Sequence, residues 1–321
     1  MRDRKARPIT ALLLPLLLTS CHGSGKKTIA VVPKGTAHAF WVSVQAGALA
    51  AGEKLGVNVL WNGPAQETEY DRQIEIVDSM IARHVDGLAV AAAERKALVQ
   101  SIDRAVSLGI PVAVFDSGVD STNYLTFIAT NNYDAGQMGA RELAKLLHGK
   151  GNVAIIMHEP GSASTMDRER GFEDLMAKDF PGINLVARQY GHSDRSKARS
   201  AAENILAAHP ELDGMFASSE PSSVGAALAI KSRGLGGKIQ FVAFDSTESM
   251  IEDLKAGVIG AMVVQDPFKM GFEAVKVLVD KLHGITPAKR IDLTPHVIER
   301  ADLDKPEIKE LLYPDVKKYL K

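Results

Sequence analysis

The chain has 321 residues, enough for about two domains, and its 45% apolar and 24% charged residues are ordinary for a soluble globular protein. Its 38 basic and 39 acidic residues nearly cancel, which argues against nucleic acid as the main partner, because duplex binders usually carry a clear basic excess. Cys21 is the only cysteine, which excludes an intramolecular disulfide.

The first 20 residues have the pattern of an export signal. Basic residues within positions 2–7 precede an apolar run over 11–18 that is too short to span a membrane as a mature helix. Leu18-Thr19-Ser20-Cys21 resembles a bacterial lipobox, in which the signal peptidase cuts before the cysteine and its sulfur carries lipid. We therefore expect a signal peptide over 1–20, lipid on Cys21 and a flexible tether over 21–27. Ordinary secretion with cleavage nearby, or a retained anchor, are the alternatives.

The hundred residues after the tether alternate short apolar runs with segments of helical periodicity. Strands are predicted over 28–32, 57–61, 87–91, 111–115 and 125–129. Helices are predicted over 40–55, 71–83 and 96–108. Strands that are apolar throughout and alternate with helices are typical of a parallel sheet covered on both faces.

The pattern then restarts. Helices are predicted over 133–147, 167–178, 195–208, 222–232, 247–256 and 267–283. Strands are predicted over 153–157, 184–190, 214–217, 239–244 and 260–264. About nine to eleven strands are too many for one doubly wound sheet, so the sequence predicts an α/β protein with two similar lobes.

Motifs of enzymes, cofactors and metals are largely absent. The sequence has no phosphate-cradling glycine loop, no metal spacing among its nine histidines, no CxxC or HExxH and no GxSxG elbow. His158-Glu159-Pro160-Gly161 could suggest acid–base work, but a turn at the end of a strand is the favoured interpretation. We expect a binding protein with no catalytic residue, cofactor or metal.

Polar and aromatic residues follow several predicted strands. They lie at 33–40, 116–117, 158–164, 218–220, 244–245 and 265–266. Because ligands of open parallel sheets bind outside the carboxyl ends of the strands, their joint placement at this edge indicates a ligand site.

These segments resemble the ribose-binding-protein-like family of periplasmic solute-binding proteins, which feed sugar ABC importers. The motifs that carry the resemblance, in family order between about 27 and 297, are His38-Ala39-Phe40-Trp41, residues 109–117, residues 128–132, residues 168–172, Phe244-Asp245 and Gln265. The resemblance implies a type I periplasmic binding protein fold, with two Rossmann-like lobes, a three-stranded hinge and sugar in the cleft. It implies an N-terminal lobe of 27–130 plus 266–293, a C-terminal lobe of 131–265 plus 294–300, and a surface-packed tail of 301–321.

The resemblance also implies a ligand site, and residue chemistry supports it. Aromatic rings cover the C–H faces of a sugar, and charged side chains take its hydroxyls by charge-assisted hydrogen bonds. Phe40, Trp41 and Phe244 are the expected rings, and Asp116 and Asp245 the expected hydroxyl acceptors. The full set is His38, Phe40, Trp41, Asp116, Ser117, Asn131, Arg168, Ser219, Glu220, Phe244, Asp245 and Gln265, whereas Arg170 is expected on the surface.

Three positions depart from the pattern of ribose binders. Ser117 replaces the arginine after Asp116, Ser193 stands where the pattern has phenylalanine, and Ser219 where it has asparagine. An aromatic lid and one guanidinium are lost, so the ribose assignment is open. The remaining excess of acceptors favours a neutral, hydroxyl-rich ligand over phosphates and carboxylates.

The expected function is that of a monomeric, lipid-anchored binding protein, periplasmic or on the cell surface, that delivers a neutral sugar or polyol to an ABC permease. The main alternative is a ligand-sensing subunit for a membrane receptor, with a sugar or an autoinducer-type furanone as ligand. A gene regulator of this fold needs a helix-turn-helix of about 60 residues before the first strand, and only 27 precede it. A glycosidase-like carboxylate pair has no feature in its favour.

Overall fold

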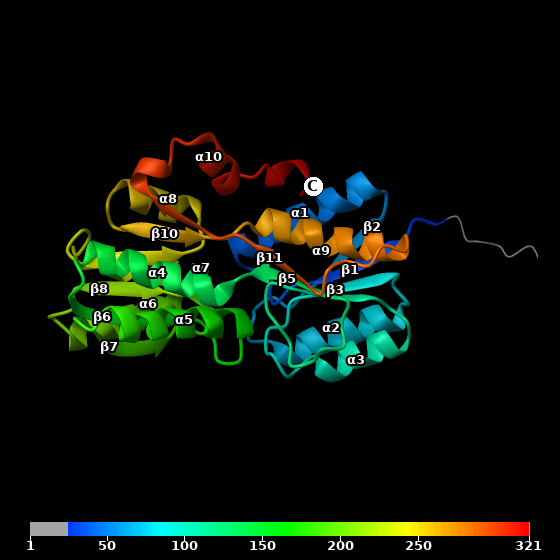
Figure 1. Ribbon diagram of the computed structural model, residues 1–321, viewed down its shortest axis with the longest axis horizontal. Coiled ribbons are helices and arrows are strands. Elements are labelled where there is room, and N and C mark those ends of the chain that lie inside the picture. The colour runs from blue at the N-terminus through cyan, green and yellow to red at the C-terminus, as the bar shows by residue number, and fades with distance from the viewer. Residues whose placement is uncertain (1–24, 321) are drawn as a thin grey trace, which may run out of the picture.

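A computed structural model describes residues 25–320, and Figure 1 shows two α/β lobes side by side. The predicted signal peptide and Cys21 lie outside the described residues. Within the described part, no helix is long and apolar enough to cross a membrane.

The first lobe is built on a six-stranded sheet in which every neighbouring pair is parallel, in the order β11-β5-β4-β3-β1-β2. Its strands are β1 (Thr28–Val32), β2 (Asn58–Trp61), β3 (Gly87–Val90), β4 (Val112–Phe115), β5 (Thr126–Thr130) and β11 (Arg290–Leu293). Its helices are α1 (Ala39–Leu55), α2 (Tyr70–Ala82), α3 (Val99–Ser107) and α9 (Pro267–Leu282). Helices α1 and α9 cover one face of the sheet, and α2 and α3 cover the other. The predicted two-sided burial of the strands is therefore confirmed.

The second lobe repeats the plan with the order β12-β10-β9-β8-β6-β7, in which only β12 runs antiparallel to its neighbour. Its strands are β6 (Gly151–Met157), β7 (Ile183–Tyr190), β8 (Gly214–Ala217), β9 (Gln240–Phe244), β10 (Ala261–Val264) and β12 (His296–Glu299). Its helices are α4 (Asn132–Leu146), α5 (Ala163–Asp179), α6 (Arg195–Ala208), α7 (Glu220–Ser232) and α8 (Glu248–Lys255). Helices α4 and α5 cover one face, and α6, α7 and α8 the other.

Among the described residues, the chain crosses between the two sheets three times, before the C-terminal tail returns to the first lobe. The crossings lie between β5 and α4, between β10 and α9, and between β11 and β12. The structure has twelve strands in residues 25–320, more than the nine to eleven expected from sequence. The strands β11 and β12 carry exposed and half-buried residues, so neither shows the continuous apolar run that marked the other strands.

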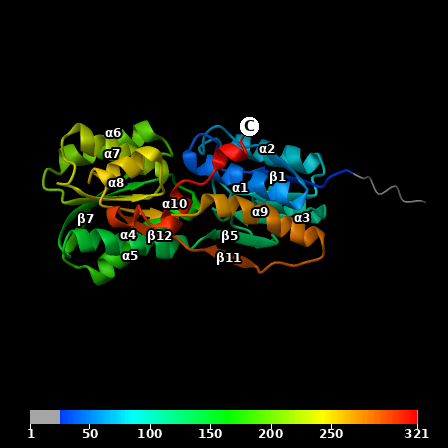
Figure 2. The same cartoon turned by 90° about the horizontal axis from the view of Figure 1, so that it is seen from above.

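The C-terminal tail passes from the second lobe back to the first (Figures 1 and 2). It contains the short helix α10 (Pro306–Leu312) and the 3₁₀ turns η1 (Arg300–Asp302) and η2 (Val316–Lys318). Ile308 and Leu312 of α10 join the core of the second lobe. The ring of Tyr319 then lies 5.8 Å from that of Phe268, at the start of α9 in the first lobe.

Helices α4 and α5 of the second lobe pack closely through glycines. A Cβ added to Gly136 in α4 would lie 1.9 Å from the backbone oxygen of Arg168 in α5, and one added to Gly171 would lie 2.1 Å from that of Tyr133. Helix α5 begins at Ala163, four residues before the predicted start. Its first turn, residues 163–166, has no apolar periodicity, so the sequence did not indicate it. The close approach of α4 fixes the backbone that carries Arg168.

Candidate functional site

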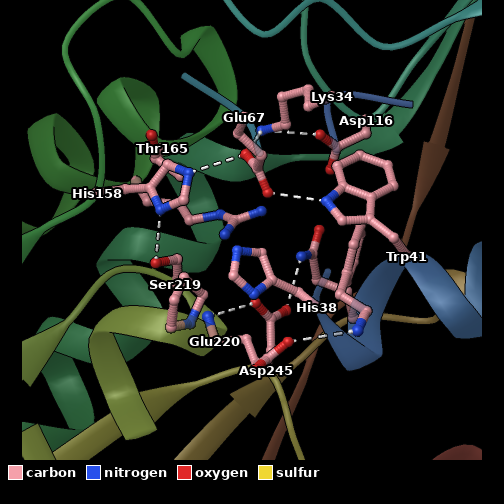
Figure 3. Close-up of a pocket in the computed structure, with 14 residues that line it drawn as sticks. Lys34, His38, Trp41, Glu67, Asp116, His158, Thr165, Ser219, Glu220 and Asp245 are labelled. Carbon is pink, nitrogen blue, oxygen red and sulfur yellow. Dashed lines mark hydrogen bonds and ion pairs between the residues drawn. The ribbon is translucent and has the colours of Figure 1, made fainter. Parts of the chain in front are cut away.

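A polar cavity lies between the two lobes, where the loops after the strands of both sheets meet (Figure 3). Its lining residues are Lys34, His38, Phe40, Trp41, Glu67, Asp116, His158, Thr165, Arg168, Ser219, Glu220, Pro221, Asp245 and Gln265. The space between the lining atoms is about 310 Å³. This space includes volume that is open to solvent, so it sets no upper limit on the size of a ligand.

The two lobes present an aspartate to this cavity in the same way. Phe115-Asp116-Ser117 ends β4, and Phe244-Asp245-Ser246 ends β9. Both aspartates have left-handed backbones, with φ of 56° for Asp116 and 66° for Asp245. Each backbone N–H donates to the neighbouring strand, from Asp116 to Ile128 at 2.9 Å and from Asp245 to Val263 at 2.8 Å. Asp tolerates this uncommon conformation, which turns the chain sharply at the strand end.

Asp245 is held from two sides. Its Oδ1 accepts from Gln265 Nε2 at 2.8 Å, and its Oδ2 accepts from the backbone N–H of Glu220 at 3.0 Å. Burial raises the pKa of the Asp245 carboxyl to about 6, and the lowering effects of Arg168 and Gln265 offset only part of that rise. The carboxylate is therefore ionised at neutral pH and close to its titration range.

Arg168 is buried and firmly oriented. Its Nε donates to Asn132 Oδ1 at 2.8 Å, and its Nη1 donates to the backbone oxygen of Ser218 at 3.0 Å. The guanidinium carbon lies 4.0 Å from the centre of the Phe244 ring. Phe244 does not line the cavity, so the ring that sequence analysis expected to stack on ligand supports Arg168 instead.

Two buried acceptors of the cavity have no hydrogen-bond partner within residues 25–320, namely Asp116 Oδ2 and Gln265 Oε1. Lys34 Nζ lies 3.2 Å from Asp116 Oδ2, which makes an ion pair without the alignment of a hydrogen bond. Buried acceptors are nearly always satisfied in folded proteins. Both oxygens therefore call for hydrogen-bond donors from a molecule in the cavity.

Sequence analysis missed three charged or titratable residues of the lining: Lys34, Glu67 and His158. Trp41 Nε1 donates to Glu67 Oε1 at 2.8 Å, and His158 Nε2 donates to Glu67 Oε2 at 3.0 Å. Although burial opposes ionisation, Lys34 and His158 hold the pKa of the Glu67 carboxyl well below its usual range. Burial lowers the pKa of the His158 imidazole, against the pull of Glu67. Lys34 and His158 lie in strand-end segments that the sequence did indicate, but no motif marked Lys34, and His158-Glu159-Pro160-Gly161 was interpreted as a turn.

Nine of the twelve expected ligand residues line the cavity, and three do not. The nine are His38, Phe40, Trp41, Asp116, Arg168, Ser219, Glu220, Asp245 and Gln265. Besides Phe244, Ser117 lies outside the lining, where its Oγ accepts from the Ser164 N–H at 3.3 Å. Asn131 caps α4 by accepting from the Asp134 N–H at 3.3 Å. Arg170 is exposed and pairs with Asp167 at 3.0 Å, as expected.

The rings of the lining offer little free aromatic surface. Trp41 is 1% exposed and belongs to the core of the first lobe. Phe40 is half-buried and meets Trp41 edge to face, with centroids 4.9 Å apart. Phe40 is therefore the ring best placed to cover a C–H face of a ligand.

Carboxylates outnumber cations in the lining. Glu67, Asp116, Glu220 and Asp245 face Lys34 and Arg168. The sequence-based balance lacked Glu67 and Lys34, and including both leaves the excess of carboxylates unchanged. Glu220 is also paired from outside the cavity, because Arg195 Nε donates to its Oε1 at 3.1 Å. Within the described chain, no group of three or more His, Cys, Asp or Glu could hold a metal ion.

Residues 29–286 match the family described as the periplasmic binding protein domain. A D-ribose/D-allose-binding protein of Pseudomonas aeruginosa is 29% identical over 287 residues, which cover 87% of this chain and 89% of that protein. The ribose import binding protein of Bacillus subtilis is 27% identical over 301 residues, which cover 90% of this chain and 96% of that protein.

Solved structures show the same architecture. A carbohydrate transporter solute binding protein from Agrobacterium radiobacter, in complex with D-arabinose, has a TM-score of 0.88 and 30% identity, covering 90% of this chain and 100% of that chain. An ABC transporter solute binding protein from Agrobacterium vitis, with bound D-fucose, has a TM-score of 0.87 and 32% identity, covering 89% and 100%. These likenesses confirm the two-lobed α/β fold predicted from sequence.

Proposed function

The chain belongs to the periplasmic binding protein family, and from that premise we propose that it captures a neutral sugar or polyol between its lobes and delivers it to an ABC import permease. The family places the protein outside the cytoplasm, and its members bind their ligand without transforming it. The observation that carries the proposal is a pair of buried acceptors without a hydrogen bond among residues 25–320. They are Gln265 Oε1 and the Asp116 Oδ2 that is ion-paired with Lys34, and sugar hydroxyls would satisfy both.

Both lobes contribute residues to the proposed site. Asp116 from the first lobe and Asp245 from the second accept hydroxyls, and Arg168 donates to a hydroxyl or ring oxygen. Phe40 covers an apolar face of the ligand. The lobes, 27–130 plus 266–293 and 131–265 plus 294–300, would close about the three crossings, a recognised hinge motion.

Several monosaccharides are candidates for the ligand. The relatives and solved neighbours are named for D-ribose, D-allose, D-arabinose and D-fucose. The departures at Ser117, Ser193 and Ser219 are the reason not to single out ribose.

A thermal-shift screen against pentoses, hexoses and polyols, with furanones included, tests the proposal. A ligand that binds only the folded state stabilises it by about 2.7 kcal/mol at a hundred times Kd. We expect one stereochemical set of monosaccharides to raise the melting temperature and to be recovered unchanged by mass spectrometry. A flat response to every sugar and polyol, or chemical conversion of the ligand, would contradict the proposal.

We propose further that the export signal over 1–20 is removed and that Cys21 carries a lipid anchor. The lipobox-like Leu18-Thr19-Ser20-Cys21 supports this proposal, as does the extracytoplasmic location of the family. Cys21→Ala should move the protein from the membrane fraction to the soluble extracytoplasmic fraction. If the variant stays in the membrane fraction, the lipid anchor is excluded.

A further inference from the structure

The loop after β6 and the start of α5, together residues 158–164 of the second lobe, make charged contacts with the first lobe. Besides the His158–Glu67 hydrogen bond at 3.0 Å, Lys34 Nζ donates to Ser162 Oγ and to Ser164 Oγ, each at 3.2 Å. The side chains of Lys34 and Glu67 are 4% and 6% exposed, so both charges are almost fully shielded when the lobes are together. In such surroundings the loss of a partner is costly.

The same loop also contacts the first lobe away from the ligand cavity. The Tyr70 hydroxyl, at the start of α2, donates to Glu159 Oε1 at 3.0 Å. The backbone N–H of Arg95 donates to the backbone oxygen of Gly161 at 3.0 Å. These bonds join the lobes without involving the ligand, because the cavity lining includes none of the four residues Tyr70, Arg95, Glu159 and Gly161.

Contacts within each lobe orient the side chains that meet at this interface. In the first lobe, Glu67 accepts from Trp41, and Lys34 lies 3.2 Å from Asp116. In the second lobe, His158 Nδ1 lies 2.9 Å from Ser219 Oγ, and the backbone N–H of His158 donates to Glu169 Oε1 at 2.9 Å. Closure therefore brings together groups that are already oriented.

Gly161 allows the loop to come this close. Its φ is +88°, and an added Cβ would lie 2.7 Å from Cγ of Glu94 in the first lobe. Glu94 has little freedom to move away, because its Oε2 accepts from the backbone N–H of Lys96 and of Ala97, each at 2.8 Å. A side chain at position 161 would push the lobes apart.

We propose that residues 158–164 form a latch that holds the lobes together without ligand and strengthens ligand binding once the cavity is filled. Each contact that forms only on closure favours the closed state by the same free energy with or without ligand. It therefore raises both the closed fraction of the free protein and the affinity for ligand. The proposal rests on the proposed function, because a latch matters only to a protein that closes on a ligand. It gives His158-Glu159-Pro160-Gly161 a positioning role.

Two phenol–carboxylate bonds of equal length provide a matched test. Tyr70→Phe removes the bond to Glu159 between the lobes, and Tyr133→Phe removes the 3.0 Å bond to Asp174 within the second lobe. Small-angle X-ray scattering without ligand should give a larger radius of gyration for Tyr70→Phe than for wild type and Tyr133→Phe. For whichever of D-ribose, D-allose, D-arabinose or D-fucose binds, Kd should rise about fivefold in Tyr70→Phe alone.

A second pair of variants tests the close approach of the loop. Gly161→Ala and Gly149→Ala both place alanine at a positive φ, but an added Cβ at Gly149 meets no atom within 4 Å. Only Gly161→Ala should open the unliganded protein. Scattering curves of Tyr70→Phe and Gly161→Ala that match wild type would overturn the latch, even if a sugar binds. Opening of both variants in a protein that binds none of the four sugars would support the latch and count against the proposed ligand class.

Discussion

At the scale of single residues, Asp245 should make ligand binding sensitive to pH. Its pKa is raised to about 6, first by burial, and hydroxyl donors from a sugar favour the ionised carboxylate. Binding then releases a proton below about pH 6, so affinity should fall as the pH drops, by about tenfold at about pH 5. Titrations of the bound sugar between about pH 8 and pH 5 measure this dependence.

The control for that titration is Asp245→Asn, which keeps the size of the side chain and removes its charge. The variant should bind the sugar more weakly and lose the decline that begins near pH 6. A wild-type affinity that stays constant down to about pH 5 would show that Asp245 does not accept from the ligand in its ionised form.

Glu169 should make stability itself depend on pH. Its carboxyl is 3% exposed, Oε2 lacks a partner among residues 25–320, and burial raises its pKa to about 7. Because this folded-state pKa lies above the unfolded value, its contribution is full below about pH 4.5 and is lost as the pH rises through 7. Wild type should therefore gain about 2 kcal/mol of unfolding free energy relative to Glu169→Gln between about pH 8 and pH 5. Urea denaturation of both proteins measures the difference, and parallel pH profiles would refute it.

Residues could be predicted from sequence where a strand places them directly at its carboxyl end. Asp116, Asp245 and Gln265 are of this kind, because the strand fixes their position and the cavity lies at that edge. Glu67 could not be predicted, since it lies in a loop and reaches the cavity through contacts with Trp41 and Lys34 that only the folded chain brings together. The sequence predicted Phe244 at the correct strand end, but Arg168 covers the face of its ring that was expected to contact a ligand.

At the scale of elements, the close packing of α4 on α5 holds the backbone of Arg168, which lines the cavity. In Gly136→Ala the new Cβ would lie 1.9 Å from the backbone oxygen of Arg168, and backbone cannot rotate away as a side chain can. We expect the free energy of unfolding to fall by about 1–3 kcal/mol and sugar affinity to fall with it, because Arg168 moves with α5. Arg141→Ala, at an exposed position of α4, should change neither quantity. Wild-type stability and affinity in Gly136→Ala would exclude this role of the helix contact.

The elements that sequence periodicity predicted are those whose burial is continuous. The central strands and the longer helices fall within a few residues of their expected bounds, because one or both faces are buried along their length. The strands β11 and β12 are short and partly exposed, and α10 presents only Ile308 and Leu312 to the core. The positions of these three elements depend on contacts with residues distant in sequence, which the local hydrophobic pattern does not indicate.

At the scale of the whole molecule, the two lobes are halves of one site. His38 from the first lobe donates to the backbone oxygen of Ser193 in the second at 3.0 Å, and residues 158–164 make further contacts between the lobes. Neither sheet alone surrounds the cavity, so a ligand can contact the whole lining only when the lobes are together. The two-lobed arrangement could be predicted from the repeated strand and helix pattern. The contacts between the lobes could not be predicted, because they join segments that have no hydrophobic periodicity.

Calorimetric titration of D-ribose, D-allose, D-arabinose and D-fucose into the protein tests the central claim most directly. We predict that a monosaccharide binds with one site per chain, and that Arg168→Ala weakens its binding by about tenfold or more. Arg170→Ala, two residues away, exposed and paired with Asp167, should bind as wild type. Failure of every sugar to bind the folded protein, or wild-type affinity in Arg168→Ala, would contradict a sugar site between the lobes.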